Sequence, residues 1–98
     1  MATFIATLTF TAEGRAALHD TCKRAAAFKA AARKMGVKVI GSYWTFGDFD
    51  GVIIFEAPEP ETAMALMLHL GVQGFVHTRT LRAFTAQEME KILETTAG

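Results

Sequence analysis

The sequence contains little cysteine and proline, and it has no excess of charge of either sign. Cys22 is the one cysteine, so the chain cannot form an internal disulfide. Lys plus Arg and Asp plus Glu number 10 each, which removes the attraction that nonspecific binding to nucleic acid or anionic membranes requires. No charged-then-apolar leader or long apolar span is present at the start. We therefore expect a cytoplasmic protein with a reduced thiol and neither nucleic acid nor membrane as a partner.

Several motifs that carry chemistry are also missing. The chain has no glycine-rich phosphate loop, no nucleophile elbow and no clustered Cys and His residues, so phosphoryl transfer, triad hydrolysis and structural zinc have no support. His19 and His69 are isolated along the chain and are interpreted as surface histidines. The prediction is no metal and no cofactor.

Apolar periodicity predicts one α+β domain over residues 1–98. Strands are expected at 2–10, 37–46, 50–57 and 75–84, where residues alternate with period two or, in Val52–Phe55, are apolar on both faces. A chain of this size is near the lower limit for burying an adequate core alone. Association with another copy would therefore help it.

Helices are expected between these strands. A short one over 11–18 precedes a longer one that starts at Asp20 or Thr21 and ends at Gly36; its apolar stripe is Cys22, Ala25, Phe28, Ala32 and Met35. On that stripe Cys22 is interpreted as a buried small apolar residue. A third helix, over 61–70, is apolar nearly all round and closes at Gly71, and a capping box at Thr85 opens the last.

The resulting order is ferredoxin-like βαββαβ with a C-terminal helix. We expect a four-stranded antiparallel sheet in the order 4-1-3-2, with both main helices on one face. The other face carries Phe4 or Ile5, which need burial. A homodimer whose sheets face one another, or a larger even-numbered oligomer, would supply that cover.

A hairpin at mid-chain carries a family resemblance. Trp44-Thr45 is followed by the turn Gly47, Asp48, Phe49 and Asp50 and then by an apolar strand, which resembles the signature of the bacterial GYD domain family with Phe49 in place of its tyrosine. The resemblance implies a dimeric α/β-barrel assembly. Some proteins of that wider group hold haem through a helix histidine, which makes His69 an alternative haem ligand.

The two aspartates of this turn allow two interpretations. Asp48 and Asp50 have the spacing of a carboxylate pair suited to acid-base chemistry. Turn formation also explains them, because aspartate hydrogen-bonds to nearby backbone. We favour the turn.

Charge differs between the two parts of the chain. Residues 1–38 carry seven basic and two acidic side chains, and 39–98 carry three basic and eight acidic. Solvated helix faces of opposite charge explain this, and complementary subunits are the alternative. We favour solvated faces.

A candidate ligand site lies on the fourth strand. His77 and Arg79 are two residues apart and project to the same face. Arg79 would bind an anionic or carbonyl oxygen, His77 would exchange a proton, and Trp44 or Tyr43, which point to opposite faces, would supply an apolar wall. The alternative is that His77 and Arg79 lie on an edge strand and pair with carboxylates across an interface, and we favour this alternative.

Three function classes remain. The first is a small-molecule (metabolite) binding module, similar to the ligand-sensing domains of Lrp/AsnC regulators, which carry a related Gly-x-Tyr-Asp hairpin. The second is a cofactor-free isomerase or monooxygenase-like enzyme of the barrel group. The third is a structural assembly component. Because no catalytic constellation is visible, we favour the binding module.

Overall fold

The computed structural model describes residues 1–96, and its elements follow the predicted order. The strands are β1 (Ala2–Phe10), β2 (Lys38–Trp44), β3 (Gly51–Ala57) and β4 (Val76–Ala83). The helices are α1 (Ala12–Ala16), a 3-10 turn at Leu18–Asp20, α2 (Thr21–Lys34), α3 (Pro60–Val72) and α4 (Ala86–Thr95). The ferredoxin-like order with a C-terminal helix is confirmed.

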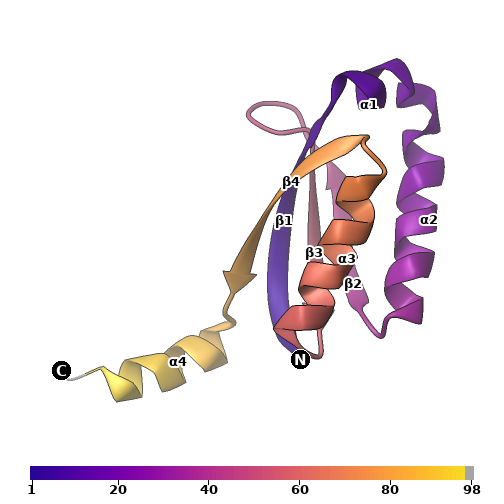
Figure 1. Ribbon diagram of the computed structural model, residues 1–98. Helices are drawn as coiled ribbons and strands as arrows, with labels where there is room; N and C mark the ends of the chain where they lie inside the picture. The colour runs from indigo at the N-terminus through magenta and orange to yellow at the C-terminus, as the bar shows by residue number, and fades with distance from the viewer. Residues whose placement is uncertain (97–98) are drawn as a thin grey trace.

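The four strands form one antiparallel sheet in the order β2-β3-β1-β4, as predicted. Helices α2 and α3 lie next to one another on the same face of this sheet (Figure 1). No helix within residues 1–96 covers the opposite face (Figure 1). We call this opposite side the open face.

The hydrophobic core lies between the sheet and these two helices. Alternate residues of β1 and β3 point into it, and Phe55 and Leu66 are completely buried there. The rings of Phe4 and Phe55 stack with their centroids 5.4 Å apart. Each large buried side chain stabilises the fold by about 1.5–3 kcal/mol. The core members are Phe4, Ala6, Phe28, Ala32, Val37, Ile53, Phe55, Ala57, Ala63, Leu66 and Met67.

The orientation of α2 differs from the prediction. Cys22 is exposed, because the stripe that faces the sheet passes through the half-buried Thr21 and Ala25 and the buried Phe28 and leaves Cys22 on its flank. Thr21 is four residues before Ala25 and lies nearly above it on the same side of the helix. Cys22 is three residues before Ala25 and is therefore turned further round the helix axis, away from the sheet. The interpretation of Cys22 as a buried residue is therefore wrong.

Two glycines with positive φ follow helix ends. Gly36, with φ of 76°, follows α2 as predicted. α3 does not stop at Leu70 but continues through Gly71 to Val72, and the chain turns at Gly74, with φ of 81°. A helix tolerates an interior glycine at a cost of about 1 kcal/mol, so Gly71 does not end it.

The last helix projects from the rest of the fold. α4 extends from the end of β4 in the direction away from α2 and α3 (Figure 1). Its start has the predicted capping box: Glu88 N–H donates to Thr85 Oγ1 and Thr85 N–H donates to Glu88 Oε1. The bond from the Thr85 N–H is the main cause that lowers the pKa of the Glu88 carboxyl from its usual 4.5. Along α4 the side chains of Met89, Ile92 and Leu93 are exposed.

Two helical glycines give a matched test of the packing. A Cβ on Gly14 would overlap the carbonyl oxygen of Phe75, whereas a Cβ on Gly71 would meet nothing. We expect Gly14→Ala to lower the free energy of unfolding by about 1–3 kcal/mol through overpacking. Gly71→Ala should raise it by about 0.4–1 kcal/mol by restricting the unfolded chain. Urea denaturation measures both, and equal effects would contradict this packing at α1.

Candidate functional site

The hairpin between β2 and β3 is held by backbone and hydroxyl groups. Thr45 N–H donates to the carbonyl of Asp50 at 2.9 Å, and Thr45 Oγ1 donates to the carbonyl of Phe49 at 2.7 Å. Gly47 has a φ of 119°, a conformation that favours glycine. Asp48 is exposed at the tip.

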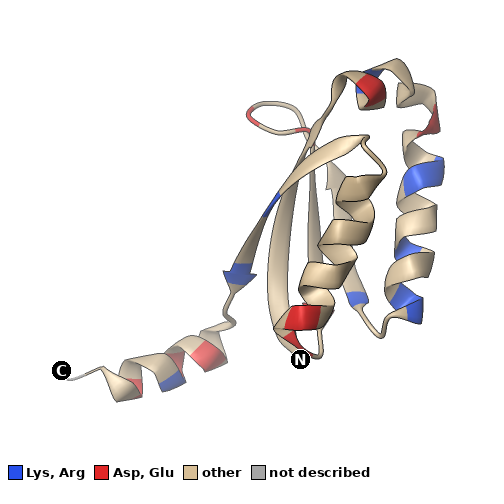
Figure 2. Ribbon diagram, viewed as in Figure 1, with Lys and Arg blue, Asp and Glu red and all other residues tan. Residues whose placement is uncertain are grey.

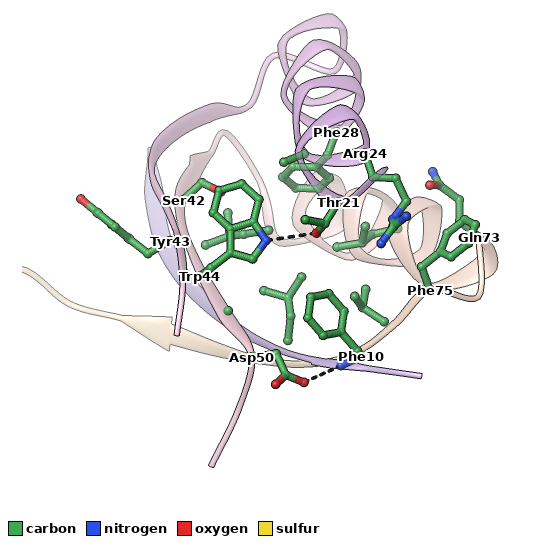
Figure 3. A pocket seen from close by; sticks show the side chains of 16 residues that line it. Phe10, Thr21, Arg24, Phe28, Ser42, Tyr43, Trp44, Asp50, Gln73 and Phe75 are labelled. Carbon is green, nitrogen blue, oxygen red and sulfur yellow. Dashed lines mark hydrogen bonds between the residues drawn. The ribbon is translucent and has the colours of Figure 1, made fainter. Parts of the chain in front are cut away.

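Asp50 connects this hairpin to β1. Its N–H donates to the carbonyl of Leu8 at 2.8 Å, and its Oδ2 accepts from Phe10 N–H at 2.8 Å (Figure 3). One carboxylate oxygen is thus committed to backbone 40 residues away, while no hydrogen bond within residues 1–96 couples Asp48 to Asp50. The structure supports a structural interpretation of the turn motif over a carboxylate pair.

The four predicted ligand residues do not form one site. Arg79, Thr7, Val52 and Tyr43 form a single row across the open face, according to the strand register. Neighbouring strands are about 4.8 Å apart, which puts the ends of this row roughly 14 Å from each other. His77 is exposed beside the row, opposite Thr9. Tyr43 is therefore too far from Arg79 for both to hold one small group.

Trp44 lies on the other face of the sheet. Its Nε1 donates to Thr21 Oγ1 on α2 at 3.0 Å (Figure 3). A β-bulge between Val39 and Gly41 reverses the alternation of β2, so that Val39 and Trp44 both point toward the helices and Tyr43 points away. Trp44 thus cannot form a wall for His77 and Arg79.

A cavity of about 70 Å³ is present next to Trp44, between α2 and the sheet (Figure 3). Its walls are mostly apolar and include the aromatic rings of Phe10, Phe28 and Phe75. Neither histidine nor cysteine lines it. The lining residues are Leu8, Phe10, Thr21, Arg24, Ala25, Phe28, Ser42, Tyr43, Trp44, Asp50, Gly51, Ile53, Leu70, Gln73, Phe75 and Val76.

Arg24 is the one basic residue of this cavity. Its Nη1 donates to the carbonyl of Ala17 at 2.7 Å, and its guanidinium lies 4.5 Å from the ring centre of Phe75. Its Nη2 is buried and has no hydrogen-bond partner within residues 1–96. The sequence prediction missed this residue, and the available signal was an arginine next to Ala25 and Phe28 on the apolar side of a helix.

The other two histidines, His19 and His69, lie away from the cavity. His19 is exposed in the 3-10 turn, and His69 is exposed on α3, where its Nε2 is 3.3 Å from Gln73 Nε2. Neither lines the cavity.

The surface charges are distributed unevenly over the elements. Basic residues lie along α2, and acidic residues occur on the hairpin, at the start of α3 and along α4 (Figure 2). The exposed lysines and arginines of α2 agree with solvated faces.

Residues 1–96 contain no group of three His, Cys, Asp or Glu side chains that could hold a metal ion. Over the same range, every helix is too short or too polar to cross a membrane.

Comparison with known proteins identifies the family. A family model described as GYD domain matches residues 4–93, from β1 into α4. The chain belongs to the GYD domain family. A relative from Thermus thermophilus is 33% identical over 90 residues, which are 91% of this chain and 95% of the relative. That relative is named a glutamine synthetase and cystathionine beta-lyase binding protein. No solved structure shows a significant match to the chain.

The Asp50 link of this GYD domain can be tested with the other turn aspartate as control. Asp50→Ala leaves the partly buried Phe10 N–H without its acceptor, so we expect a loss of about 1–3 kcal/mol of unfolding free energy. Asp48→Ala should change it by less than about 0.5 kcal/mol, as exposed sites usually do. Hydrogen exchange at the Phe10 amide should accelerate in Asp50→Ala alone. Equal exchange in both variants would refute the link.

Proposed function

We propose that this GYD domain is a non-catalytic module that forms a homodimer through its open face and binds a metabolic enzyme through its helical layer. The observation that carries the proposal is the distribution of exposed apolar side chains over two opposite sides of so small a fold. The name of the Thermus relative supports it, because that protein is named for binding two enzymes, glutamine synthetase and cystathionine beta-lyase.

The open face suits a second copy of the chain. Ile54 and Ile5 lie side by side at its centre, and Leu81 extends their row on β4 with 60% of its surface exposed. A row of exposed branched aliphatic side chains on a sheet face is normally covered. A two-fold axis places the same patch on both sides of one interface, which is the commonest arrangement in homo-oligomers.

α4 supports the same arrangement. It extends away from the helical layer, and its apolar residues Met89, Ile92 and Leu93 pack extensively on no other element of residues 1–96. A second subunit on the open face would lie on the side to which α4 projects. Both apolar surfaces are then buried by one partner.

A dimer of this kind leaves α3 on the outside. Met64, Leu68 and Val72 recur every four residues along α3 and are 62%, 59% and 82% exposed. We call these three residues the α3 ridge. When two open faces meet, each helical layer points outward, so the α3 ridge remains accessible on both subunits. Rows of exposed apolar side chains at this helical spacing commonly act as anchors for a partner.

An enzymatic function has less support. Asp50 Oδ2 accepts from Phe10 N–H, and both His77 and Arg79 are exposed. His77 borders a wide, open hollow at the start of β4, which Arg79 does not line. No nucleophile is paired with a base among the residues of the cavity. A small-molecule site remains compatible with the binding module.

Two substitutions of equal exposure test the dimer. Wild-type protein should have twice the 10.7 kDa chain mass by light scattering at micromolar concentration. Leu81→Glu places a charge in the dimer interface and should give a folded monomer, because burying an unpaired charge is costly. Leu68→Glu, at 59% exposure, should remain a dimer. A monomeric wild type would refute the dimer.

The same pair of variants tests enzyme binding. Immobilised wild type should bind glutamine synthetase or cystathionine beta-lyase from the same organism in biolayer interferometry. Leu68→Glu should weaken that binding by about tenfold or more while the dimer persists. If Leu68→Glu instead converts a larger oligomer to a dimer and leaves enzyme binding intact, the α3 ridge joins subunits and the assignment of the enzyme to it is wrong.

A further inference from the structure

One nitrogen of Arg24, a residue that lines the cavity next to Trp44, has no hydrogen-bond partner within residues 1–96. Arg24 Nη1 caps the carbonyl of Ala17, and the guanidinium face covers Phe75. Nη2 is buried and donates to no atom of residues 1–96. A buried donor without an acceptor is unfavourable, and a charged donor most of all. The fold therefore leaves one charged donor of a cavity-lining residue without an acceptor.

We propose that the cavity binds a small carboxylate with a short branched apolar body. A small shift of the Arg24 side chain brings Nη2 to the cavity, where it donates to one carboxylate oxygen, since guanidinium groups match the geometry of carboxylates. The hydroxyl of Thr21 also lines the cavity and accepts from Trp44 Nε1, so its own proton is available for the second oxygen. No covalent step is involved.

The remaining walls select the rest of the ligand. Phe28, Phe75 and Leu70 supply apolar surface, which favours a hydrocarbon body over a sugar or a nucleotide. The volume of about 70 Å³ leaves room for about five water-sized groups. The four carbons of a short branched chain fit this limit, with the carboxylate group at the Arg24 end, whereas a phosphate with four hydrated oxygens would meet apolar atoms on most sides.

Asp50 is the second charged residue that lines the cavity, and it lies far enough from Arg24 to leave that end free for an anion. Asp50 lies at the opposite end from Arg24 (Figure 3). Its Oδ2 accepts from Phe10 N–H, and within residues 1–96 it forms no salt bridge with Arg24. The carboxylate end of the ligand therefore lies with Arg24 and Thr21, away from Asp50.

This site goes beyond the proposed function and does not depend on it. The cavity is on the helix-covered side of the sheet, and the proposed dimer uses the open face. The α3 ridge points outward from the same helical layer. Loss of dimerisation or of enzyme binding would leave the carboxylate site untouched.

Three probes separate charge from shape in the wild-type protein. Isovalerate has the carboxylate and the branched body, isovaleramide has the same shape without the charge, and acetate has the charge without the body. Titration is followed by calorimetry and by the emission of Trp44, which is the sole tryptophan of the chain and lines the cavity. We expect isovalerate to bind about tenfold or more tightly than either of the other two.

Variants on one helix locate the anion. Arg24→Gln should weaken isovalerate binding by about tenfold or more, whereas Arg33→Gln, an exposed arginine further along α2, should leave it unchanged. Ala25→Leu fills the cavity without changing any charge and should abolish binding. If Arg24→Gln fails to fold, the comparison of isovalerate with isovaleramide on wild type decides. Equal binding of those two, no binding of isovalerate, or equal loss in Arg33→Gln would overturn the proposal.

Discussion

β3 carries apolar side chains on both faces, so both faces of this strand must be shielded from water by other parts of the structure. Ile53 and Phe55 point toward the helices and are buried, while Val52 and Ile54 point to the open face and remain partly exposed. Burial of one face alone leaves the other in water, which is unfavourable for branched aliphatic side chains. The helical layer on one side and the incomplete surface on the other both follow from this strand at the centre of the sheet.

Features set by neighbouring residues could be predicted from the sequence. The alternation over residues 2–10 identified β1, Gly36 identified the end of α2, and Thr85 with Glu88 identified the start of α4. Each of these depends on contacts within a few positions along the chain. The strand order also follows, because the ferredoxin-like topology limits the ways in which four such strands can pair.

The candidate site could not be predicted because it depends on contacts between distant elements. The bulge between Val39 and Gly41 decides that Trp44 rather than Tyr43 faces the helices. Glycine within a strand often marks a bulge, but Gly41 alone does not determine the pairing register on either side of it. The rotation of α2 decides that Thr21 and Arg24, not Cys22, line the cavity. Packing against the sheet sets that rotation. The helical periodicity of the sequence predicts the rotation only to within about one residue.

The edges of the sheet have a consequence for association. One edge strand, β2, is interrupted by its bulge, and the other, β4, carries His77, Arg79 and Arg82 along its length. Bulges and charged side chains are the devices by which natural proteins prevent a sheet from recruiting further strands. Growth of this sheet into longer ribbons is therefore disfavoured. The same features disfavour cross-β stacking of one molecule on the next and leave the two faces of the sheet as the surfaces for association.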